Sequence, residues 1–310
     1  MTVPHLLVGI DIGGTKTDAV AIDSDGVIAE RLRLPTGFGP DAVLETARTA
    51  VATLTELTGV PVADFASIGI GIPGAVDSVT GRVAHAVNLG LDDLDLGGEL
   101  ARTWGRPVRV DNDVNAAAVG AFHLMERDPS HSMAYLNLGT GLAAGIVLGG
   151  RVWRGARGTA GEIGHIPVDP NGPECPCGQR GCLEMVASGS SIARLWPTAD
   201  ERPASALFAA AEAGDLRALE IRQRFTQNVA AAVRMLVLTV DVDSVVLGGG
   251  LSTLGSPLLD DVVGVLADWE HRAPLLASIE LSSRVAILPA DFPAAAVGAA
   301  RVGLAEAGDS

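Results

Sequence analysis

The chain of 310 residues is poor in aromatic and basic side chains and has no long apolar run, and each shortage excludes a class of protein. Aromatic residues make up 4% while hydrophobic residues make up 48%, so Ala, Val, Leu and Ile must build the core. Lys and Arg number 22 against 37 Asp and Glu, and this net charge of −15 disfavours nucleic-acid binding. The longest apolar stretch, Val229 to Val240, is interrupted by Arg234 and too short to span a bilayer. The opening segment lacks a basic region and a cleavage site, so we expect a cytoplasmic protein without signal peptide or membrane partner.

Cysteine is also scarce, and all three cysteines fall within eight residues, at Cys175, Cys177 and Cys182. Together with His165 they form a Cys₃His set, which closes a tetrahedral structural zinc site. Three unliganded thiols are the alternative. A redox role is disfavoured because the first spacing is C-x-C and not C-x-x-C.

Two carboxylates flank this cluster, Glu162 before His165 and Glu184 after Cys182. A metal ion would restrain the loop over about 162–184 and fix the positions of both carboxylates. A site that binds hydroxyl groups requires such fixed side chains. The alternative is that both are solvated surface acids.

Apolar runs that end in glycine turns predict an α/β protein of two lobes, because the chain exceeds the usual size of one core. Strands are predicted at 6–12, 18–23 and 27–34, with a GGT turn at 13–15. A similar meander starts at Met133, with a GTG turn at 139–141 and its second strand at 142–148. Helices are predicted at 115–125 and 216–240. We interpret the two meanders as a duplicated three-stranded unit, one for each lobe; two unrelated meanders are the alternative.

Three glycine turns follow apolar strands and can bind phosphate through backbone N–H groups. Asp11 can hold a hydrated Mg²⁺ beside the first turn. No Walker loop or G-x-G-x-x-G helix start occurs, so a nucleotide would lie between hairpin turns; purely structural turns are the alternative. The predicted ATP-binding residues are Asp11, Gly13, Gly14, Thr15, Lys16, Gly139, Thr140, Gly141, Gly248, Gly249 and Gly250.

A candidate general base lies where a predicted strand, 106–113, passes into a helix. Asp113 can accept the proton of an attacking hydroxyl while Asn112 holds a neighbouring sugar oxygen. The alternative is that Asp113 only caps the helix, a role in which aspartate is common.

These motifs resemble the ROK family (repressors, open reading frames, kinases) of the actin/hexokinase-like superfamily. The resemblance spans the chain and consists of VGIDIGGTKT at 8–17, GIGIPGAVD at 69–77, NDVNAAAVG at 112–120, LGTG at 138–141, RGARGTAGEIGH at 154–165, CPCGQRGCLE at 175–184 and VLGGGL at 246–251. It implies a ribonuclease H-like fold with a small lobe, 1–120 plus about 293–310, and a large lobe, 121–292. It also implies a homodimer or homotetramer.

For the site, the resemblance implies that Asp113 is the catalytic base. The sugar ligands would be Gly74, Asn112, Asp113, Glu162, His165 and Glu184. His165 would bind Zn²⁺ through one ring nitrogen and the sugar through the other. Two positions depart from the family pattern: Ala143 is expected to narrow the space near the phosphates, and Ala121 stands where glucokinases of the family carry Glu.

The leading hypothesis is therefore an ATP-dependent kinase that phosphorylates the 6-hydroxyl of a hexose, with glucose as first candidate and Mg²⁺ as companion of ATP. N-acetylmannosamine and N-acetylglucosamine are the alternative substrates. A non-catalytic sugar-sensing regulator is the alternative class, but the first strand begins at Leu6 and leaves no room for an N-terminal winged helix. Polyphosphate as donor stays open, although no track of Lys and Arg is visible.

Overall fold

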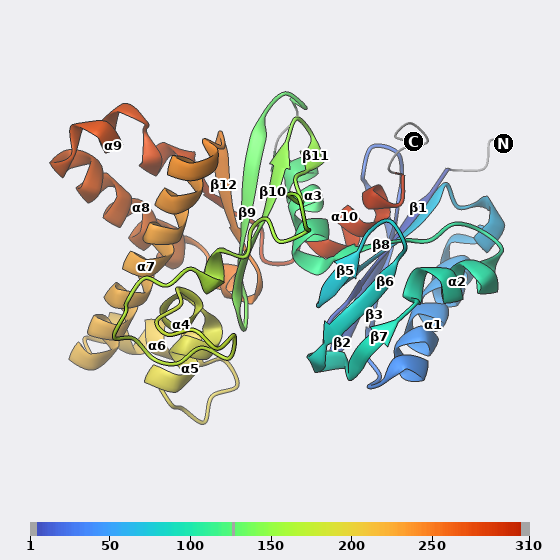
Figure 1. Ribbon diagram of the computed structural model, residues 1–310, viewed down its shortest axis with the longest axis horizontal. Helices are drawn as coiled ribbons and strands as arrows, with labels where there is room; N and C mark the ends of the chain where they lie inside the picture. The colour runs from blue at the N-terminus through green and yellow to red at the C-terminus, as the bar shows by residue number, and fades with distance from the viewer. Residues whose placement is uncertain (1–4, 126–127, 305–310) are drawn as a thin grey trace.

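In the computed structural model, which describes residues 5–125 and 128–304, two five-stranded sheets stand side by side (Figure 1). The first sheet has the order β3-β2-β1-β4-β8. Its strands are β1 (Leu7–Ile12), β2 (Lys16–Ile22), β3 (Ile28–Pro35), β4 (Ser67–Ile72) and β8 (Arg109–Asn112). The second has the order β11-β10-β9-β12-β13. Its strands are β9 (Ser132–Leu138), β10 (Leu142–Leu148), β11 (Arg151–Val152), β12 (Ser244–Gly248) and β13 (Val285–Ile287).

The two sheets repeat one topology. β1 pairs antiparallel with β2 and parallel with β4, and β9 pairs antiparallel with β10 and parallel with β12. Both central strands are buried apolar runs, as expected for strands covered on both faces. This repeat confirms the duplicated unit, although the third strand of the second copy has only two residues.

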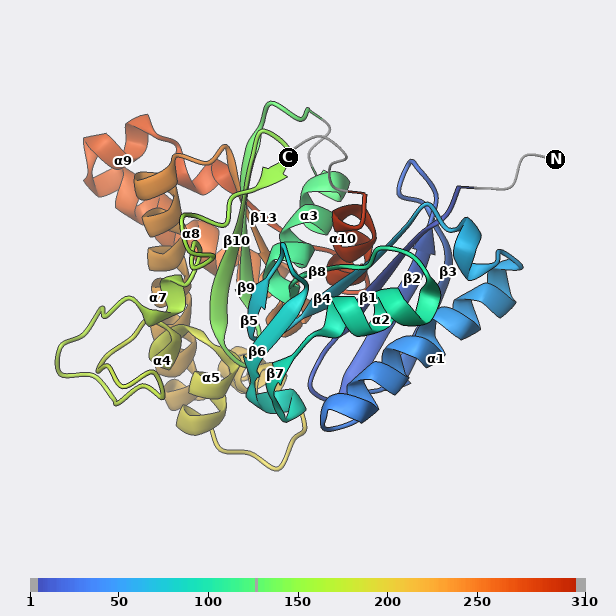
Figure 2. The same ribbon diagram turned by 45° about the vertical axis from the view of Figure 1, so that its right-hand side comes forward.

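Helices cover the outer faces of both sheets (Figures 1 and 2). The α-helices of the described residues are α1 (Pro40–Thr58), α2 (Leu96–Trp104), α3 (Asp113–Met125), α4 (Glu184–Ala187), α5 (Gly189–Leu195), α6 (Pro203–Glu212), α7 (Leu216–Val240), α8 (Ser256–Arg272), α9 (Pro274–Ser278) and α10 (Ala294–Val302). α1 and α2 pack on the first half, and α6, α7 and α8 on the second. None of the described helices is long and apolar enough to cross a membrane.

α3 and α10 lie between the two sheets, side by side in both views (Figures 1 and 2). α10 packs on β1 and β4, and α3 packs on β9 and β10. Backbone meets backbone here: a Cβ atom added to Gly9 would lie 1.8 Å from the carbonyl oxygen of Ala296. The C-terminal helix thus rests on the N-terminal sheet, in keeping with the proposed small lobe, whose exact boundaries stay a prediction.

Sequence periodicity missed one small sheet. Three short strands, β5 (Ala75–Asp77), β6 (Arg82–Ala86) and β7 (Leu91–Leu94), form an antiparallel sheet beyond the end of β4. Each has five residues or fewer, which is too short for an alternating pattern to stand out. The helix predicted to begin at Asn115 begins at Asp113 instead.

Candidate active site and metal centre

The predicted site residues lie at the carboxyl ends of strands from both sheets. Gly13 follows β1, Gly74 lies two residues beyond β4, and Asp113 follows β8. In the second sheet Gly139 follows β9 and Gly249 follows β12. Because the carboxyl ends of parallel strands meet at one edge of a sheet, the repeated topology gathers these residues.

A first cavity of about 430 Å³, here called the lysine cavity, opens between the two halves. It is lined by Asp11 and Lys16 of the first sheet and by Gly249 and Gly250 of the second, with Asp113 at its wall. Residues of two predicted phosphate turns and the candidate base therefore line one space.

A second cavity of about 760 Å³, here called the glutamate cavity, reaches Asn112, the residue before Asp113. Gly74, Asn112 and Glu162 line it. Val114 lines both cavities, so both reach the start of α3. Within the described residues, the Glu162 carboxylate makes no hydrogen bond or ion pair and is free to accept hydroxyl groups.

The helix cap is provided by Asn112 and not by Asp113 alone. Oδ1 of Asn112 accepts hydrogen bonds from the N–H groups of Val114 (2.9 Å) and Asn115 (3.4 Å), while Oδ1 of Asp113 accepts the N–H of Val114 at 3.0 Å. Burial raises the pKa of Asp113, the backbone N–H bonds oppose this, and the charge of Glu162 adds to the rise. A carboxylate has about four lone-pair sites, so these bonds leave Asp113 able to accept a proton.

A second carboxyl group stands in the lysine cavity. Burial, reinforced by the charges of Asp113 and Asp18, raises the pKa of Asp11 to about 8, against the opposing effects of Lys16 and Arg33. Excess negative charge at this point favours a bound cation.

The two hairpin turns are alike in their hydrogen bonds. Gly13 N–H donates to the carbonyl of Lys16 (3.0 Å), and Gly139 N–H donates to the carbonyl of Gly141 (3.1 Å). The third turn contains Gly249, whose φ of 78° favours glycine and whose N–H donates to the hydroxyl of Tyr135 at 2.9 Å. Lys16, Gly249 and Gly250 line the lysine cavity, whereas Gly13–Thr15 and Gly139–Gly141 line neither cavity, and their phosphate contacts stay predictions.

Glu184 and His165 do not line either cavity. Glu184 begins α4, and its Oε2 accepts a hydrogen bond from Leu142 N–H at 2.9 Å, beside the Gly139–Gly141 turn. His165 ends a short 3₁₀ helix (Ile163–His165) whose N-cap is Glu162, and this turn joins the metal loop to the glutamate cavity. Their sugar-binding roles stay predictions.

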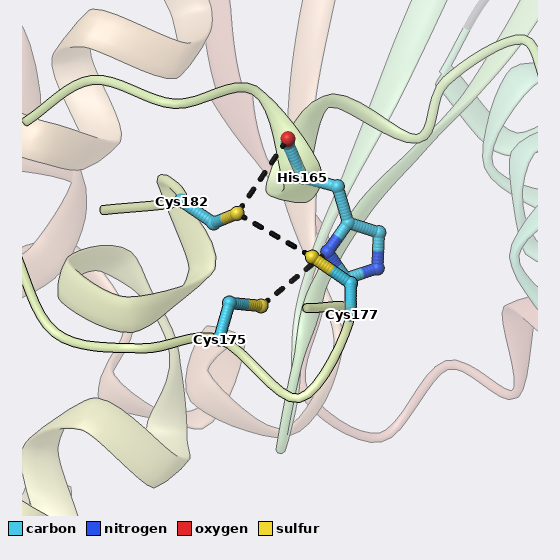
Figure 3. A group of neighbouring side chains, drawn as sticks. All are labelled: His165, Cys175, Cys177 and Cys182. Carbon is cyan, nitrogen blue, oxygen red and sulfur yellow. Dashed lines mark hydrogen bonds between the residues drawn. The ribbon is translucent and has the colours of Figure 1, made fainter. Parts of the chain in front are cut away.

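The four predicted metal ligands converge in space (Figure 3). The ligand atoms of His165, Cys175, Cys177 and Cys182 lie within 4.8 Å of one another. The separations are 3.7 Å from His165 Nδ1 to Cys175 Sγ and 3.6 Å between the sulfurs of Cys177 and Cys182. A tetrahedral site with zinc–sulfur bonds of about 2.3 Å has edges of about 3.8 Å, so the cluster fits a metal ion of this kind.

The chemistry of the thiols agrees. Burial and the neighbouring thiols Cys177 and Cys175 raise the pKa of Cys182 to about 12. Thiolates packed so closely repel one another, and a divalent cation removes that repulsion. Nδ1 of His165 faces the sulfurs, which leaves Nε2 on the other edge of the ring (Figure 3).

Comparison with known proteins agrees with this geometry. A profile of the ROK family matches residues 7–298. The chain belongs to the ROK family. It is 35% identical over 274 residues to a glucokinase from Halalkalibacterium halodurans, covering 82% of this chain and 83% of the relative. It is 37% identical over 280 residues to an N-acetylmannosamine kinase from Citrobacter koseri, covering 88% and 91%.

A solved ROK structure has the same fold. The ROK family glucokinase from Streptomyces griseus, in complex with glucose and AMPPNP, superposes with a TM-score of 0.79 at 30% identity, covering 96% of this chain and 99% of that one. The predicted two-lobed actin/hexokinase-like architecture of the ROK family is therefore confirmed.

The structure also shows residues that sequence reasoning missed. Asp111, one residue before Asn112, is 1% exposed and pairs with Arg154. Asp111 directly precedes Asn112 and Asp113, and Arg154 begins the RGARGTAGEIGH motif, but nothing in the sequence indicated that these two side chains would pair. Ala143 lines the glutamate cavity, and the expectation that it narrows the space near the phosphates stays a prediction. Ala121 is fully buried, so a glutamate there would place an unpaired charge in the core.

Proposed function

We propose that this ROK protein is an ATP-dependent kinase that transfers the γ-phosphate to the 6-hydroxyl of a hexose. One observation carries the proposal: two cavities reach consecutive residues, the lysine cavity Asp113 and the glutamate cavity Asn112, and Val114 lines both. The lysine cavity has groups that can bind phosphate, namely Lys16 and the Gly249 turn, and the glutamate cavity has Glu162, which can bind hydroxyl groups. A sugar in the glutamate cavity would thus present a hydroxyl to Asp113 and to a phosphate in the lysine cavity.

The chemistry follows from the raised pKa of the buried base. Asp113 accepts the proton of the sugar hydroxyl, the sugar oxygen bonds to the γ-phosphorus, and the bond from that phosphorus to the β-bridging oxygen breaks, releasing ADP. Phosphoryl transfer depends mainly on alignment and charge stabilisation, so one base and two rigid turns suffice. The ammonium group of Lys16 would oppose the negative charge of the phosphates.

Two metal ions belong to the proposal. Zn²⁺ would be held by His165, Cys175, Cys177 and Cys182, where it stabilises the loop that carries Glu162 and Glu184. Mg²⁺ would accompany ATP, with a carboxylate oxygen of Asp11 among its oxygen ligands, and would neutralise phosphate charge.

The remaining ligand assignments are also proposals. The nucleotide would contact Asp11, Gly13, Gly14, Thr15, Lys16, Gly139, Thr140, Gly141, Gly248, Gly249 and Gly250. The sugar would contact Gly74, Asn112, Asp113, Glu162, His165 and Glu184. Assembly as a homodimer or homotetramer is proposed from the family resemblance, and light scattering during gel filtration tests it.

Glucose is the first substrate to test, since relatives from H. halodurans and S. griseus are glucokinases. N-acetylmannosamine is the second, because the C. koseri relative that acts on it has the higher identity of 37%. A coupled assay for ADP with glucose, mannose, fructose, N-acetylmannosamine and N-acetylglucosamine separates them. If the protein forms ADP with none of these sugars, the proposal is refuted. Replacing ATP by polyphosphate in the same assay identifies the phosphate donor.

A further inference from the structure

An ion pair between a buried carboxylate and a partly exposed guanidinium group connects the two halves beside the proposed sugar pocket. Asp111 is the residue before Asn112 on β8, and its side chain is 2% exposed. Nη2 of Arg154 donates to its Oδ2, and Nε donates to its Oδ1 at 3.4 Å. Arg154 belongs to the loop after β11 of the second sheet, so the contact bridges 43 positions in the sequence and both sheets.

Asp111 also forms hydrogen bonds with residues on either side of the candidate base. Its Oδ1 accepts the backbone N–H of Asn112 at 2.9 Å and Nδ2 of Asn115 at 3.4 Å. These two residues flank Asp113 and Val114 at the start of α3. The same carboxylate therefore holds the guanidinium group and the turn from strand to helix.

The loop that carries Arg154 also carries Glu162, and it is closed on itself. Ala160 N–H donates to the carbonyl of Arg154 at 3.2 Å. Gly161, next in the chain, accepts a hydrogen bond from Ala144 N–H of β10 at 2.8 Å. Glu162 is therefore fixed to the second sheet through Gly161 and to the first sheet through Arg154.

The burial of Asp111 makes this link strong. A buried carboxylate is stabilised by a partner that offers several donors in the right plane, which arginine does. Without that partner the carboxylate would keep its cost of desolvation. Arg154 lines the glutamate cavity together with Asn112 and Glu162, so the pair forms part of the wall that a sugar would face.

We propose that Arg154 is a positioning residue for the sugar: through Asp111 it sets the distance between Glu162, which binds, and Asn112–Asp113, which orient and deprotonate. The proposal rests on the proposed kinase function. Displacing such groups by about 1 Å costs about 100-fold in rate, so loss of the Asp111–Arg154 pair should impair sugar recognition. The Gly13 and Gly249 turns do not touch it, so recognition of ATP is independent of it.

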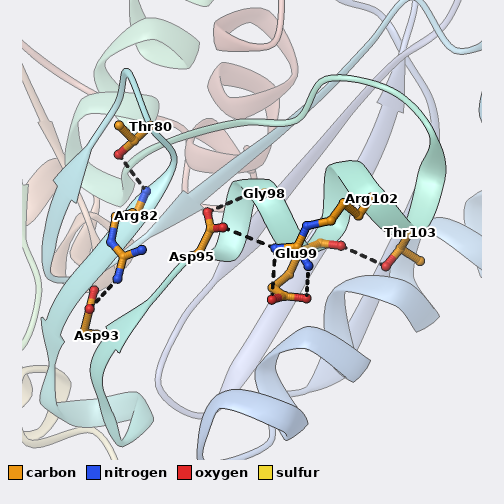
Figure 4. A network of polar contacts seen from close by, with 8 residues as sticks. All are labelled: Thr80, Arg82, Asp93, Asp95, Gly98, Glu99, Arg102 and Thr103. Carbon is orange, nitrogen blue, oxygen red and sulfur yellow. Dashed lines mark hydrogen bonds and ion pairs between the residues drawn. The ribbon is translucent and has the colours of Figure 1, made fainter.

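The test uses the full-length protein with its sugar and compares Arg154→Gln, Arg154→Lys, Asp111→Asn and the double variant Asp111→Asn/Arg154→Gln. The matched control is Arg82→Gln, which breaks another Arg–Asp pair. Arg82 and Asp93 join β6 and β7 at the surface, with side chains 49% and 58% exposed, and neither lines a described cavity (Figure 4).

We expect Arg154→Gln to raise KM for the sugar about 10- to 100-fold and to leave KM for ATP within about twofold. Asp111→Asn should give a similar rise, and the double variant should not exceed the larger single effect by more than about threefold, because both changes break one contact. Arg154→Lys should recover part of the affinity, since lysine keeps the charge but not the forked geometry. Arg82→Gln should change neither KM.

A merely structural role predicts a different result. In that case the variants lose thermal stability and active fraction while both KM values stay at the wild-type level, and this outcome overturns the proposal. An equal rise in KM for ATP also overturns it. Calorimetric titration of the sugar without ATP measures the same affinity without turnover. If the wild-type chain turns over and Arg154→Gln binds sugar normally, only the positioning role fails; if the wild-type chain neither binds nor phosphorylates any sugar, the kinase proposal fails with it.

Discussion

Replacing Asp113 by asparagine should separate catalysis from stability, and it should move them in opposite directions. Asparagine has the same shape, and its Oδ1 can still accept the hydrogen bond that the N–H of Val114 donates to Asp113 at 3.0 Å in the wild type. The cap on α3 comes from Asn112, so the helix keeps its first hydrogen bonds. What disappears is the proton acceptor, and a general base contributes about 100- to 10,000-fold, or about 2.7–5.4 kcal/mol of barrier.

Stability should rise because the wild-type carboxylate is held in an unfavourable environment. Burial raises its pKa above the ordinary 3.8, so between 3.8 and the folded pKa the native state binds more protons than the unfolded state. The free energy of unfolding therefore falls as pH rises through that window. The asparagine side chain does not titrate, so the stability advantage of Asp113→Asn should be small below pH 3.8 and should grow as pH rises.

The assay combines kcat in the ADP-coupled reaction, sugar affinity by calorimetry, and urea unfolding at several pH values. We expect kcat to fall at least about 100-fold while the sugar dissociation constant changes little. Near wild-type turnover would show that Asp113 is not the base. A stability advantage that shrinks as pH rises would show that burial does not control this carboxyl group.

Three further predictions concern other parts of the molecule. Purified protein should contain one zinc ion per chain by atomic emission, and Cys177→Ser should lose zinc and sugar affinity together; full sugar affinity without zinc would contradict this. Lys16→Ala should raise KM for ATP about tenfold, equal to about 1.4 kcal/mol, and leave KM for the sugar unchanged; the reverse pattern would remove Lys16 from the nucleotide site. Gly298→Ala should lower the free energy of unfolding by about 3 kcal/mol or more, because its Cβ would lie 1.7 Å from the carbonyl oxygen of Ala116. Its control, Gly264→Ala in α8, meets no atom within 4 Å and should stabilise by about 1 kcal/mol; equal effects of the two changes in urea unfolding would refute the packing argument.

Local patterns predicted the elements that continuous apolar runs or long helical periodicity define. α7 has the predicted bounds Leu216–Val240, and β10 has the predicted bounds Leu142–Leu148. The cysteine spacing predicted a convergent cluster because four ligands on short turns leave few alternatives. The Asp113 cap was left open, since the sequence cannot show that the neighbouring Asn112 would take that role.

Contacts between distant segments could not be predicted in this way. The partner of Asp111 lies 43 positions away, and neither residue has a spacing that marks the other. The sheet β5-β6-β7 was missed for a related reason, since its short strands are stabilised by pairing with one another and not by their own composition. Both features help to form the glutamate cavity, through Asp111, Arg154 and Ala75–Asp77.

The repeated topology explains why there is one base and not two. β8 leads into α3 as β13 leads into α10, and these counterpart helices pack against each other between the sheets. The contact is reciprocal: a Cβ at Gly120 would meet the carbonyl of Ala294, and a Cβ at Gly298 would meet that of Ala116. The copies differ at the turn. In the first, Asn112 and Asp113 lead directly from strand to helix, whereas in the second six residues, 288–293, separate β13 from α10. Only the first copy can hold a carboxylate at the helix start between the two cavities, so duplication provides the paired phosphate turns and the direct strand-to-helix turn at Asp113 provides the chemistry.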